Sequence, residues 1–269
     1  MREDELMLMD ILKCRRVDLY AQKIPLTDEQ QRQFLLMKER RKNGEPLQYI
    51  LGETEFVNCR IQINPFVLIP RPETEILVEV LLDIMGRWDK GKTIQVLDVG
   101  TGSGNIAIAL AKNFSSCYVT ALDVSSAALD VARKNARLND VFDKINFIEA
   151  DMRNFFSSRV NGMGGFDIIV SNPPYIPTRE LAHLPMDVRQ EPDLALDGGE
   201  DGLTYIQFLL CHGPEWLAQD GYLACEIGDK QTRAIENLWQ GFQFYDSLNF
   251  IKDYTNTDRI FITRKRQHG

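Results

Sequence analysis

Short apolar runs alternate with amphipathic stretches from residue 93 to the end of the chain. The runs that we interpret as strands are Thr93–Val99, Tyr118–Leu122, Ile145–Ile148, Phe166–Ser171 and Tyr222–Ile227. Patterns with helical spacing, such as Asn105–Lys112 and Ser126–Leu138, lie between them. This alternation predicts an α/β fold with a mostly parallel sheet that helices cover on both faces. Two further runs, Phe244–Leu248 and Arg259–Thr263, predict an antiparallel C-terminal hairpin that brings the sheet to seven strands.

Residues 1–46 have the pattern of a small helical domain. Apolar residues recur at helical spacing near the start, and a Thr-x-x-Gln capping box at Thr27 opens a second helix. Gly44 and Pro46 end that helix. The apolar positions that we assign to buried helix faces are Leu6, Met9, Ile11, Leu12, Phe34, Leu35 and Met37.

Residues 47–72 read as a linker built around a β-hairpin. Its predicted extended pieces are Tyr49–Leu51, Glu55–Val57 and Arg60–Ile63. The last piece alternates polar and apolar residues, as a half-buried strand does. Residues 73–269 then form the sheet domain, which opens with a helix over Glu73–Met85. The predicted organisation is therefore a helical domain, a hairpin linker and a larger α/β domain.

The composition and charge indicate a cytoplasmic protein without a stable nucleic-acid partner. The chain of 269 residues has a net charge of −8, which is a poor match to a phosphate backbone. Its five cysteines are scattered without a Cys-x-x-Cys pair, which favours reduced thiols and argues against a zinc site. No signal-peptide core and no membrane-length apolar run is present. We expect a soluble monomer in the cytoplasm.

A glycine-rich loop follows the first predicted strand of the sheet domain. It consists of Gly100, Thr101, Gly102, Ser103 and Gly104, and an apolar helix comes directly after it. Glycines let the backbone turn sharply and let a ligand approach it closely, at the crevice where such sheets bind ligands. The third glycine of the dinucleotide fingerprint is replaced by Asn105, and no Gly-Lys-Ser/Thr follows. A pyrophosphate cofactor is therefore disfavoured.

Acidic residues end the next two predicted strands. Asp123 stands where a carboxylate can accept hydrogen bonds from ribose hydroxyls. Asp151 and Met152 follow the third strand, where the acid could meet an adenine amino group and the methionine could pack on the ring. The alternatives are that Asp123 is a helix cap or turn residue and that Met152 fills the core. Together with the glycine loop, these positions predict a site for an adenosine-containing methyl donor.

The turn Asn172-Pro173-Pro174-Tyr175 follows the fourth predicted strand and is suited to holding a planar NH2 group. The Asn172 side-chain carbonyl can accept one of the two hydrogens. Pro174 restricts Pro173, so the Pro173 carbonyl can accept the other hydrogen. Tyr175 offers an aromatic face for a flat group. A turn-capping asparagine before proline is the structural alternative for Asn172.

From about residue 40 to the C-terminus the chain resembles the PrmC/HemK family of glutamine methyltransferases. The segments that carry the resemblance are Gly44–Gly52, Leu68–Glu75, Asp98–Gly104, Ser171–Ile176, Glu191–Pro192 with Ala195–Leu196 and Gly199, and Glu226–Gly228. The family implies a Rossmann-like class I methyltransferase fold with a substrate-recognising N-terminal domain. It also implies methyl transfer from S-adenosylmethionine to the side-chain amide nitrogen (N5) of the glutamine in the Gly-Gly-Gln motif of class-1 peptide chain release factors, leaving S-adenosylhomocysteine.

In such a reaction Asn172, Pro173 and Tyr175 would orient the acceptor nitrogen without acting as acid or base. Asn172 would also lie near the donor, and Pro174 and Leu68 would help to form the glutamine pocket. Arg71 is expected either to pair with Glu73 or to mark a helix start, and Glu191 is expected at the rim of the pocket. The family resemblance leaves open which release factor is preferred and whether other Gly-Gly-Gln proteins are substrates.

Two other functions are compatible with parts of the pattern. An adenine-N6 methyltransferase of DNA or RNA uses the same Asn-Pro-Pro-Tyr chemistry, and the basic run at residues 38–42 could contact phosphate. A donor-binding scaffold without activity is the second alternative, although it has no need of an acceptor motif. His183, His212 and His268 share no metal-like spacing, so no metal site is expected.

Overall fold

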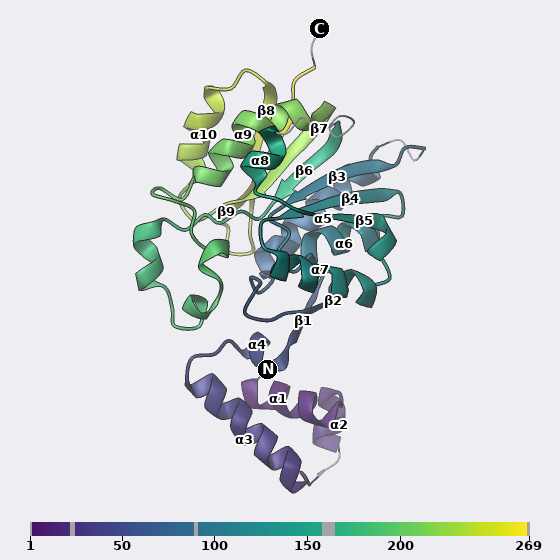
Figure 1. The fold of residues 1–269 in the computed structure, drawn as a ribbon, viewed down its shortest axis with the longest axis vertical. Helices are drawn as coiled ribbons and strands as arrows, with labels where there is room; N and C mark the ends of the chain where they lie inside the picture. Colours follow the sequence, from purple (N-terminus) through teal and green to yellow (C-terminus); the bar gives the residue numbers. More distant parts are fainter. Residues whose placement is uncertain (1, 22–24, 89–90, 158–164, 268–269) are drawn as a thin grey trace.

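The computed structural model describes residues 2–21, 25–88, 91–157 and 165–267. Four helices form an N-terminal unit that stands apart from the sheet in Figure 1. These helices are α1 (Glu3–Leu12), α2 (Arg16–Ala21), α3 (Asp28–Lys42) and α4 (Leu47–Leu51). They pack around their own small core of Met7, Met37, Leu47 and Ile50. The predicted capping box at Thr27 is confirmed, because Gln30 N–H donates to its hydroxyl and the Gln30 side chain accepts from Thr27 N–H.

Two details of this region were predicted wrongly. Tyr49–Leu51 belongs to helix α4 and not to a strand, because Ile50 N–H and Gly52 N–H donate to carbonyls four residues earlier. An apolar run of three residues fits the spacing of a helix as well as that of a strand. Pro46 precedes this run and favours the start of a helical turn. Leu35 is 56% exposed and does not share the buried face of α3 with Met37.

The predicted hairpin is present as β1 (Glu53–Phe56) and β2 (Cys59–Gln62), an antiparallel pair. Val57 and Asn58 form its turn with φ of 43° and 60°. The hairpin is fastened to the sheet domain by side chains of helix α7 (Ser126–Leu138) and the residue that caps it. Asn135 bonds both backbone groups of Gln62, and Asn139 does the same for Arg60. Both asparagines thus replace the missing strand partner of β2.

The central sheet has seven strands in the order β5-β4-β3-β6-β7-β9-β8, of which the part from β5 to β7 can be followed in Figure 1. Its strands are β3 (Ile94–Val99), β4 (Cys117–Asp123), β5 (Ile145–Glu149), β6 (Phe166–Ser171), β7 (Leu217–Glu226), β8 (Tyr245–Lys252) and β9 (Asp258–Lys265). Neighbours from β5 to β7 are parallel, whereas β9 is antiparallel to both β7 and β8. The predicted mostly parallel sheet with an antiparallel C-terminal hairpin is confirmed.

Helices cover both faces of the sheet and create two hydrophobic cores. One core joins α5 (Pro72–Gly86), α6 (Asn105–Asn113) and α7 to the first face, together with the hairpin. The other joins α8 (Met152–Ser157), α9 (Thr204–Trp216) and α10 (Thr232–Gln240) to the second face. Neighbouring residues of one strand divide between the cores: Val96 and Leu97 lie in different ones. Between β6 and α9 the chain forms short 3-10 helices at Thr178–His183, Val188–Gln190 and Asp193–Ala195.

The strand order determines where a ligand can bind. The chain moves outward from β3 to β4 and β5, and then returns to place β6 on the other side of β3. The loops that leave the carboxyl ends of β3 and β6 therefore diverge and leave a crevice between them. Both motifs singled out from the sequence follow these two strands.

Candidate active site

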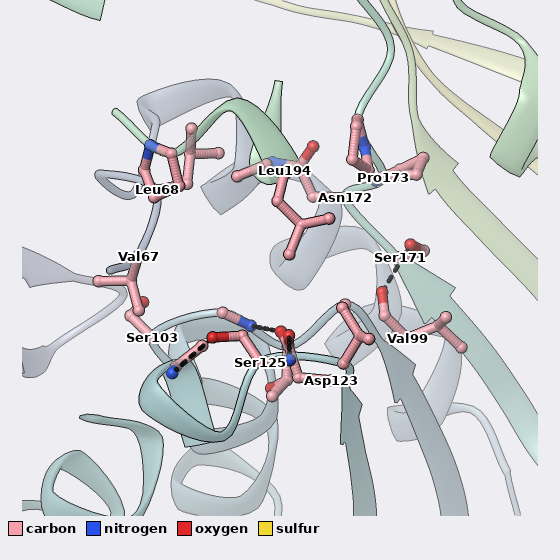
Figure 2. A pocket seen from close by; sticks show the side chains of 18 of the residues that line it. Val67, Leu68, Val99, Ser103, Asp123, Ser125, Ser171, Asn172, Pro173 and Leu194 are labelled. Carbon is pink, nitrogen blue, oxygen red and sulfur yellow. Dashed lines mark hydrogen bonds between the residues drawn. The ribbon is translucent and has the colours of Figure 1, made fainter. Parts of the chain in front are cut away.

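A cavity of about 310 Å³ opens at the carboxyl ends of β3, β4, β5 and β6. Figure 2 shows Asp123 and Ser125 on one side of it, and Leu194, Asn172 and Pro173 on the other. The segments 65–70 and 192–195 complete its wall. The structure thus brings the predicted donor loop and the predicted acceptor turn to a single site.

The glycine loop forms one side of the cavity with its backbone exposed to it. Gly100, Gly102 and Gly104 have φ of 73°, 54° and 80°, a region that L side chains rarely adopt. A Cβ atom on Gly104 would also lie 3.0 Å from the Cβ of Ala132 on α7. Gly100, Thr101, Gly102 and Ser103 line the cavity, whereas Gly104 is not among the lining residues and packs against α7 instead. Under the loop, the Thr101 hydroxyl donates to buried Asp98 over 2.6 Å.

Asp123 lies at the end of β4 and faces the cavity (Figure 2). Its carboxylate accepts from Gly102 N–H at 2.8 Å and from Ser125 N–H at 2.9 Å. Burial raises the pKa of the Asp123 carboxyl, although these backbone bonds oppose the shift. Each Asp123 carboxylate oxygen still has a free lone pair, because an ionised carboxylate can accept about four hydrogen bonds in total. Asp123 therefore holds the glycine loop and still offers acceptors to a ligand.

Asp151 and Met152 line the same cavity from the loop after β5. The Asp151 carboxylate accepts from Arg153 N–H at 2.7 Å, which supports the first turn of α8. The apolar side chains of Ile106, Leu122 and Val124 lie on this side as well. A planar aromatic ring would find an apolar wall here with an acidic group at its edge.

The acceptor turn is anchored to β3 before it reaches the cavity. The Ser171 hydroxyl donates to Val99 carbonyl oxygen over 2.7 Å (Figure 2), and Asn172, Pro173 and Pro174 then line the cavity. The Asn172 Nδ2 group donates to the Thr74 hydroxyl at 3.0 Å. The NH2 end of the Asn172 amide is therefore occupied by the protein, and its oxygen is the end left for a ligand.

Tyr175 is placed differently from the expectation. It is not among the described residues that line the cavity, and its hydroxyl donates to Glu226 at 3.1 Å. Burial raises the pKa of this phenol far above its usual value. The structure does not support the predicted contact between the Tyr175 ring and a bound amide, because the bond to Glu226 directs the side chain elsewhere.

Small residues pack against the back of this turn. A Cβ atom on Gly202 would lie 2.3 Å from Tyr175 carbonyl oxygen, and one on Gly198 would lie 2.8 Å from that of Pro174. The Gln231 side chain donates to Tyr175 carbonyl oxygen at 3.0 Å. The turn is thus held from behind by a close backbone approach and by a side-chain hydrogen bond.

The rim of the cavity is closed by a buried carboxylate. Leu68 lines the cavity from the segment 65–70, as expected. Beside it, Glu191 forms an ion pair with Arg71 and accepts from Ile69 N–H at 3.0 Å. Of the two alternatives for Arg71, the pair with Glu73 is wrong because the Arg71 guanidinium pairs with Glu191, and the helix-start alternative is confirmed because Arg71 directly precedes α5. Glu191 instead joins two segments of the rim that are far apart in sequence.

The comparisons with known proteins agree on one family. A family model described as the PrmC N-terminal domain matches residues 2–52, and one described as the methyltransferase small domain matches residues 72–185. A release factor glutamine methyltransferase of Moorella thermoacetica is 41% identical over 229 residues, which cover 85% of this chain and 78% of that protein. The chain belongs to the release factor glutamine methyltransferase family.

Other relatives support this assignment. A release factor glutamine methyltransferase of Thermodesulfovibrio yellowstonii is 36% identical over 267 residues, covering 98% of this chain and 92% of that protein. Among solved structures, a methyltransferase of Pyrococcus furiosus superposes with a TM-score of 0.55 at 21% identity, covering 89% of this chain and 99% of that one. That likeness concerns the fold and confirms the predicted class I methyltransferase architecture.

In this member of the release factor glutamine methyltransferase family, the sequence motifs missed several residues that shape the site. Thr74 and Glu226 stand behind Asn172, and Asn135 donates to Ser103 carbonyl oxygen at 2.9 Å beneath the glycine loop. Phe66 and Leu194 lie at the cavity with more than half of their surface exposed. Of these residues, only Thr74 and Glu226 lie within segments that carry the family resemblance, and the sequence pattern indicates no role for either.

The described part of the chain shows no group of three His, Cys, Asp or Glu side chains that could hold a metal ion. Within the same ranges, every helix is too short or too polar to cross a membrane. All five cysteines are free thiols, and Cys59, Cys117 and Cys225 are buried.

Proposed function

We propose that the chain transfers a methyl group from S-adenosylmethionine to the side-chain amide nitrogen of the glutamine in the Gly-Gly-Gln motif of class-1 peptide chain release factors. The observation that carries the proposal is that Asn172 and the glycine loop line one cavity, with the Nδ2 group of Asn172 already bonded to Thr74. The names of the relatives support the same acceptor protein. The free cysteines are in keeping with a cytoplasmic location.

The donor fits the side of the cavity formed by the loops after β3, β4 and β5. Asp123 accepts from the ribose hydroxyls, and the glycine backbone allows the amino-acid part to approach closely. Asp151 accepts from the adenine amino group while Met152 packs on the ring. The sulfonium, when bound, supplies an electrophilic methyl group. A cavity of about 310 Å³ is within the size range of small-molecule sites.

The acceptor side orients a poor nucleophile. An amide nitrogen shares its lone pair with the carbonyl, so the protein must hold it in line with the methyl carbon. The Asn172 side-chain oxygen and the Pro173 carbonyl each accept one hydrogen of the substrate NH2. This pair favours the positive charge that develops on nitrogen as the N–C bond forms and the S–C bond breaks. Leu68 and Pro174 enclose the glutamine side chain.

The reaction needs no strong base within the cavity. The alkylated amide nitrogen is acidic and releases its proton to water, while the sulfur keeps the electron pair of the broken bond. Asn172 therefore acts by position and charge rather than by proton transfer. Tyr175 contributes by fixing the turn, in place of the ring contact expected from the sequence.

Transfer of labelled methyl to three acceptors tests the proposal. The acceptors are purified release factor, the same factor with Gly-Gly-Gln changed to Gly-Gly-Ala, and duplex DNA. We expect label on the intact factor alone. Label on DNA would instead indicate an adenine methyltransferase, and label on none of them would indicate a scaffold that only binds the donor.

A further inference from the structure

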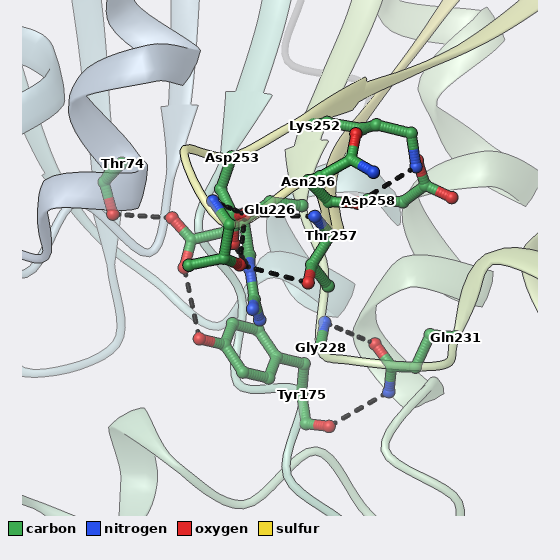
Figure 3. A network of polar contacts seen from close by, with 12 residues as sticks. Thr74, Tyr175, Glu226, Gly228, Gln231, Lys252, Asp253, Asn256, Thr257 and Asp258 are labelled. Atoms are coloured by element: carbon green, nitrogen blue, oxygen red, sulfur yellow. Dashed lines mark hydrogen bonds and ion pairs between the residues drawn. The ribbon is translucent and has the colours of Figure 1, made fainter.

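A buried chain of polar side chains stands behind Asn172. The Asn172 Nδ2 group donates to Thr74 Oγ1 at 3.0 Å, and Thr74 Oγ1 donates to Glu226 Oε2 at 2.5 Å. The other Glu226 oxygen accepts from the Tyr175 hydroxyl at 3.1 Å. Figure 3 shows Thr74 and Tyr175 reaching different oxygens of the Glu226 carboxylate, Thr74 from the left and Tyr175 from below. The chain joins the first turn of α5, the end of β7 and the acceptor turn after β6.

The count of protons in this chain determines how the Asn172 amide is turned. An ionised carboxylate can only accept, so both hydroxyls must donate to Glu226. Thr74 has a single hydroxyl proton, and after giving it to Glu226 it can only accept from Asn172. The NH2 end of the Asn172 amide must therefore face Thr74, and its oxygen must face the cavity that Asn172 lines.

The opposite orientation would disable the site. It would present the Asn172 NH2 group to the NH2 group of the substrate, so that two donors would face each other. An isolated amide side chain has no strong preference between its two flipped orientations, because its oxygen and nitrogen ends have almost the same shape. The hydrogen-bond partners behind Asn172 therefore determine which of the two amide orientations is favoured.

We propose that Thr74 and Glu226 are positioning residues for methyl transfer, which hold the Asn172 amide with its oxygen toward the acceptor nitrogen. This inference rests on the proposed function, because it concerns how the amide acceptor is oriented. Thr74 reaches the cavity wall beside Asn172, whereas Glu226 is not among the described residues that line it, and the role inferred for both is exerted through Asn172.

A helix-capping role does not account for Thr74. Helix α5 begins after Arg71 without a side-chain cap, and Thr74 directs its hydroxyl toward β7 instead. Thr74 and Glu226 are each 1% exposed, so the hydrogen bond between them is shielded from solvent. A buried carboxylate is unfavourable for folding unless its partners compensate, and here two hydroxyls offset part of that cost.

The arrangement predicts a dependence on pH. Burial raises the pKa of Glu226 to about 7. The charged groups that act on it are Glu73 on α5, which raises the pKa, and Arg259 on β9, which lowers it and is itself bonded to Asp253. Once protonated, Glu226 can donate a hydrogen bond to the Thr74 hydroxyl. The Thr74 hydroxyl can then donate to the Asn172 side-chain oxygen, which favours the flipped orientation of the amide. Turnover should therefore fall as the pH drops through about 7.

The decisive experiment compares Thr74→Val with Thr74→Ser. Valine keeps the shape and removes the hydroxyl, whereas serine keeps the hydroxyl. We expect kcat on release factor to fall about 10- to 100-fold in Thr74→Val. Donor affinity should stay within a few-fold, and Thr74→Ser should retain most of the wild-type kcat. A Thr74→Val enzyme with wild-type kcat would overturn the inference while leaving the proposed function intact.

Glu226→Gln supplies a second measurement that does not depend on the folding of Thr74→Val. The variant should lose the fall in kcat near pH 7 that the wild type shows. Asp98, under the glycine loop, also has a pKa that burial raises to about 7, so the variant is needed to attribute the fall. Persistence of the same acidic limb in Glu226→Gln would overturn the role of Glu226. Absence of methylation by the wild type itself would overturn the proposed function, and this inference with it.

Discussion

The two ends of the cavity are built in different ways. At the donor end, Gly102 N–H and Ser125 N–H donate to the Asp123 carboxylate. The shape of the glycine loop is therefore set by backbone groups and one nearby carboxylate. At the acceptor end, Asn172 depends on Thr74, 98 residues away, and Thr74 depends on Glu226, 152 residues away. The donor end is determined by short segments that follow adjacent strands. The acceptor end requires the tertiary packing of α5 against the sheet.

This difference leads us to expect that damage at one end will spare the other. The two ends share the cavity, and the Ser171 hydroxyl bonds the start of the acceptor turn to Val99 at the start of the donor loop. Among the contacts described above, no hydrogen bond joins Asn172, Thr74 or Glu226 to Asp123 or to Gly102. Binding of the donor and transfer of its methyl group should then respond to different substitutions. Three experiments test or refine this separation.

The largest effect is expected for Asn172→Ala. Loss of the amide oxygen removes one of the two acceptors that orient the substrate nitrogen, and turnover should fall about 100- to 1,000-fold. Donor affinity, measured by calorimetry, should stay within a few-fold of wild type. A comparable loss of donor affinity would show that Asn172 serves the donor and that the two ends are not separate.

Asp123→Ala should have the reverse effect. The donor should bind about 10- to 100-fold more weakly, because a charged acceptor is lost and Gly102 N–H loses its partner. At saturating donor, kcat should stay within a few-fold of wild type. Unchanged donor affinity would exclude the ribose role. Exposed Glu79→Gln on α5 is a suitable control for an unrelated loss of charge.

The smallest effect concerns stability and refines the account of the acceptor end. Glu226 keeps its proton up to a pKa of about 7 when folded, whereas its ordinary value is 4.5. The folded state therefore binds more protons than the unfolded state between these values, and stability falls as the pH rises. From pH 6 to 8 the wild type should lose about 1 kcal/mol of unfolding free energy relative to Glu226→Gln.

Thermal unfolding of both proteins at pH 6 and pH 8 measures this difference, as a relative shift in Tm of about 2–4 °C. Asp98 and Asp123 titrate in both proteins and cancel in the comparison. A difference between the two proteins that does not change with pH would mean that Glu226 does not titrate in this range.

The sequence predicted most of the fold because periodicity and length distinguish its strands from its helices. The prediction failed at Tyr49–Leu51, where three apolar residues carry no period. At the site, the predicted donor residues other than Gly104 line the cavity, because such residues follow strand ends directly. Thr74 and Glu226 could not be assigned, since a single threonine and a single glutamate have no pattern. Tyr175 was misplaced because its hydroxyl partner became visible only in three dimensions.

Gly198 and Gly202 limit how the enzyme can be altered. Neither carries a functional group, yet a methyl group at either position would collide with the backbone behind the Asn-Pro-Pro-Tyr turn. A mutant library intended to change acceptor specificity should therefore keep both positions fixed and vary Leu68, Phe66 and Leu194 around the opening. At this site a position can therefore be intolerant of substitution because the backbone passes close to it, even where its side chain has no chemical role.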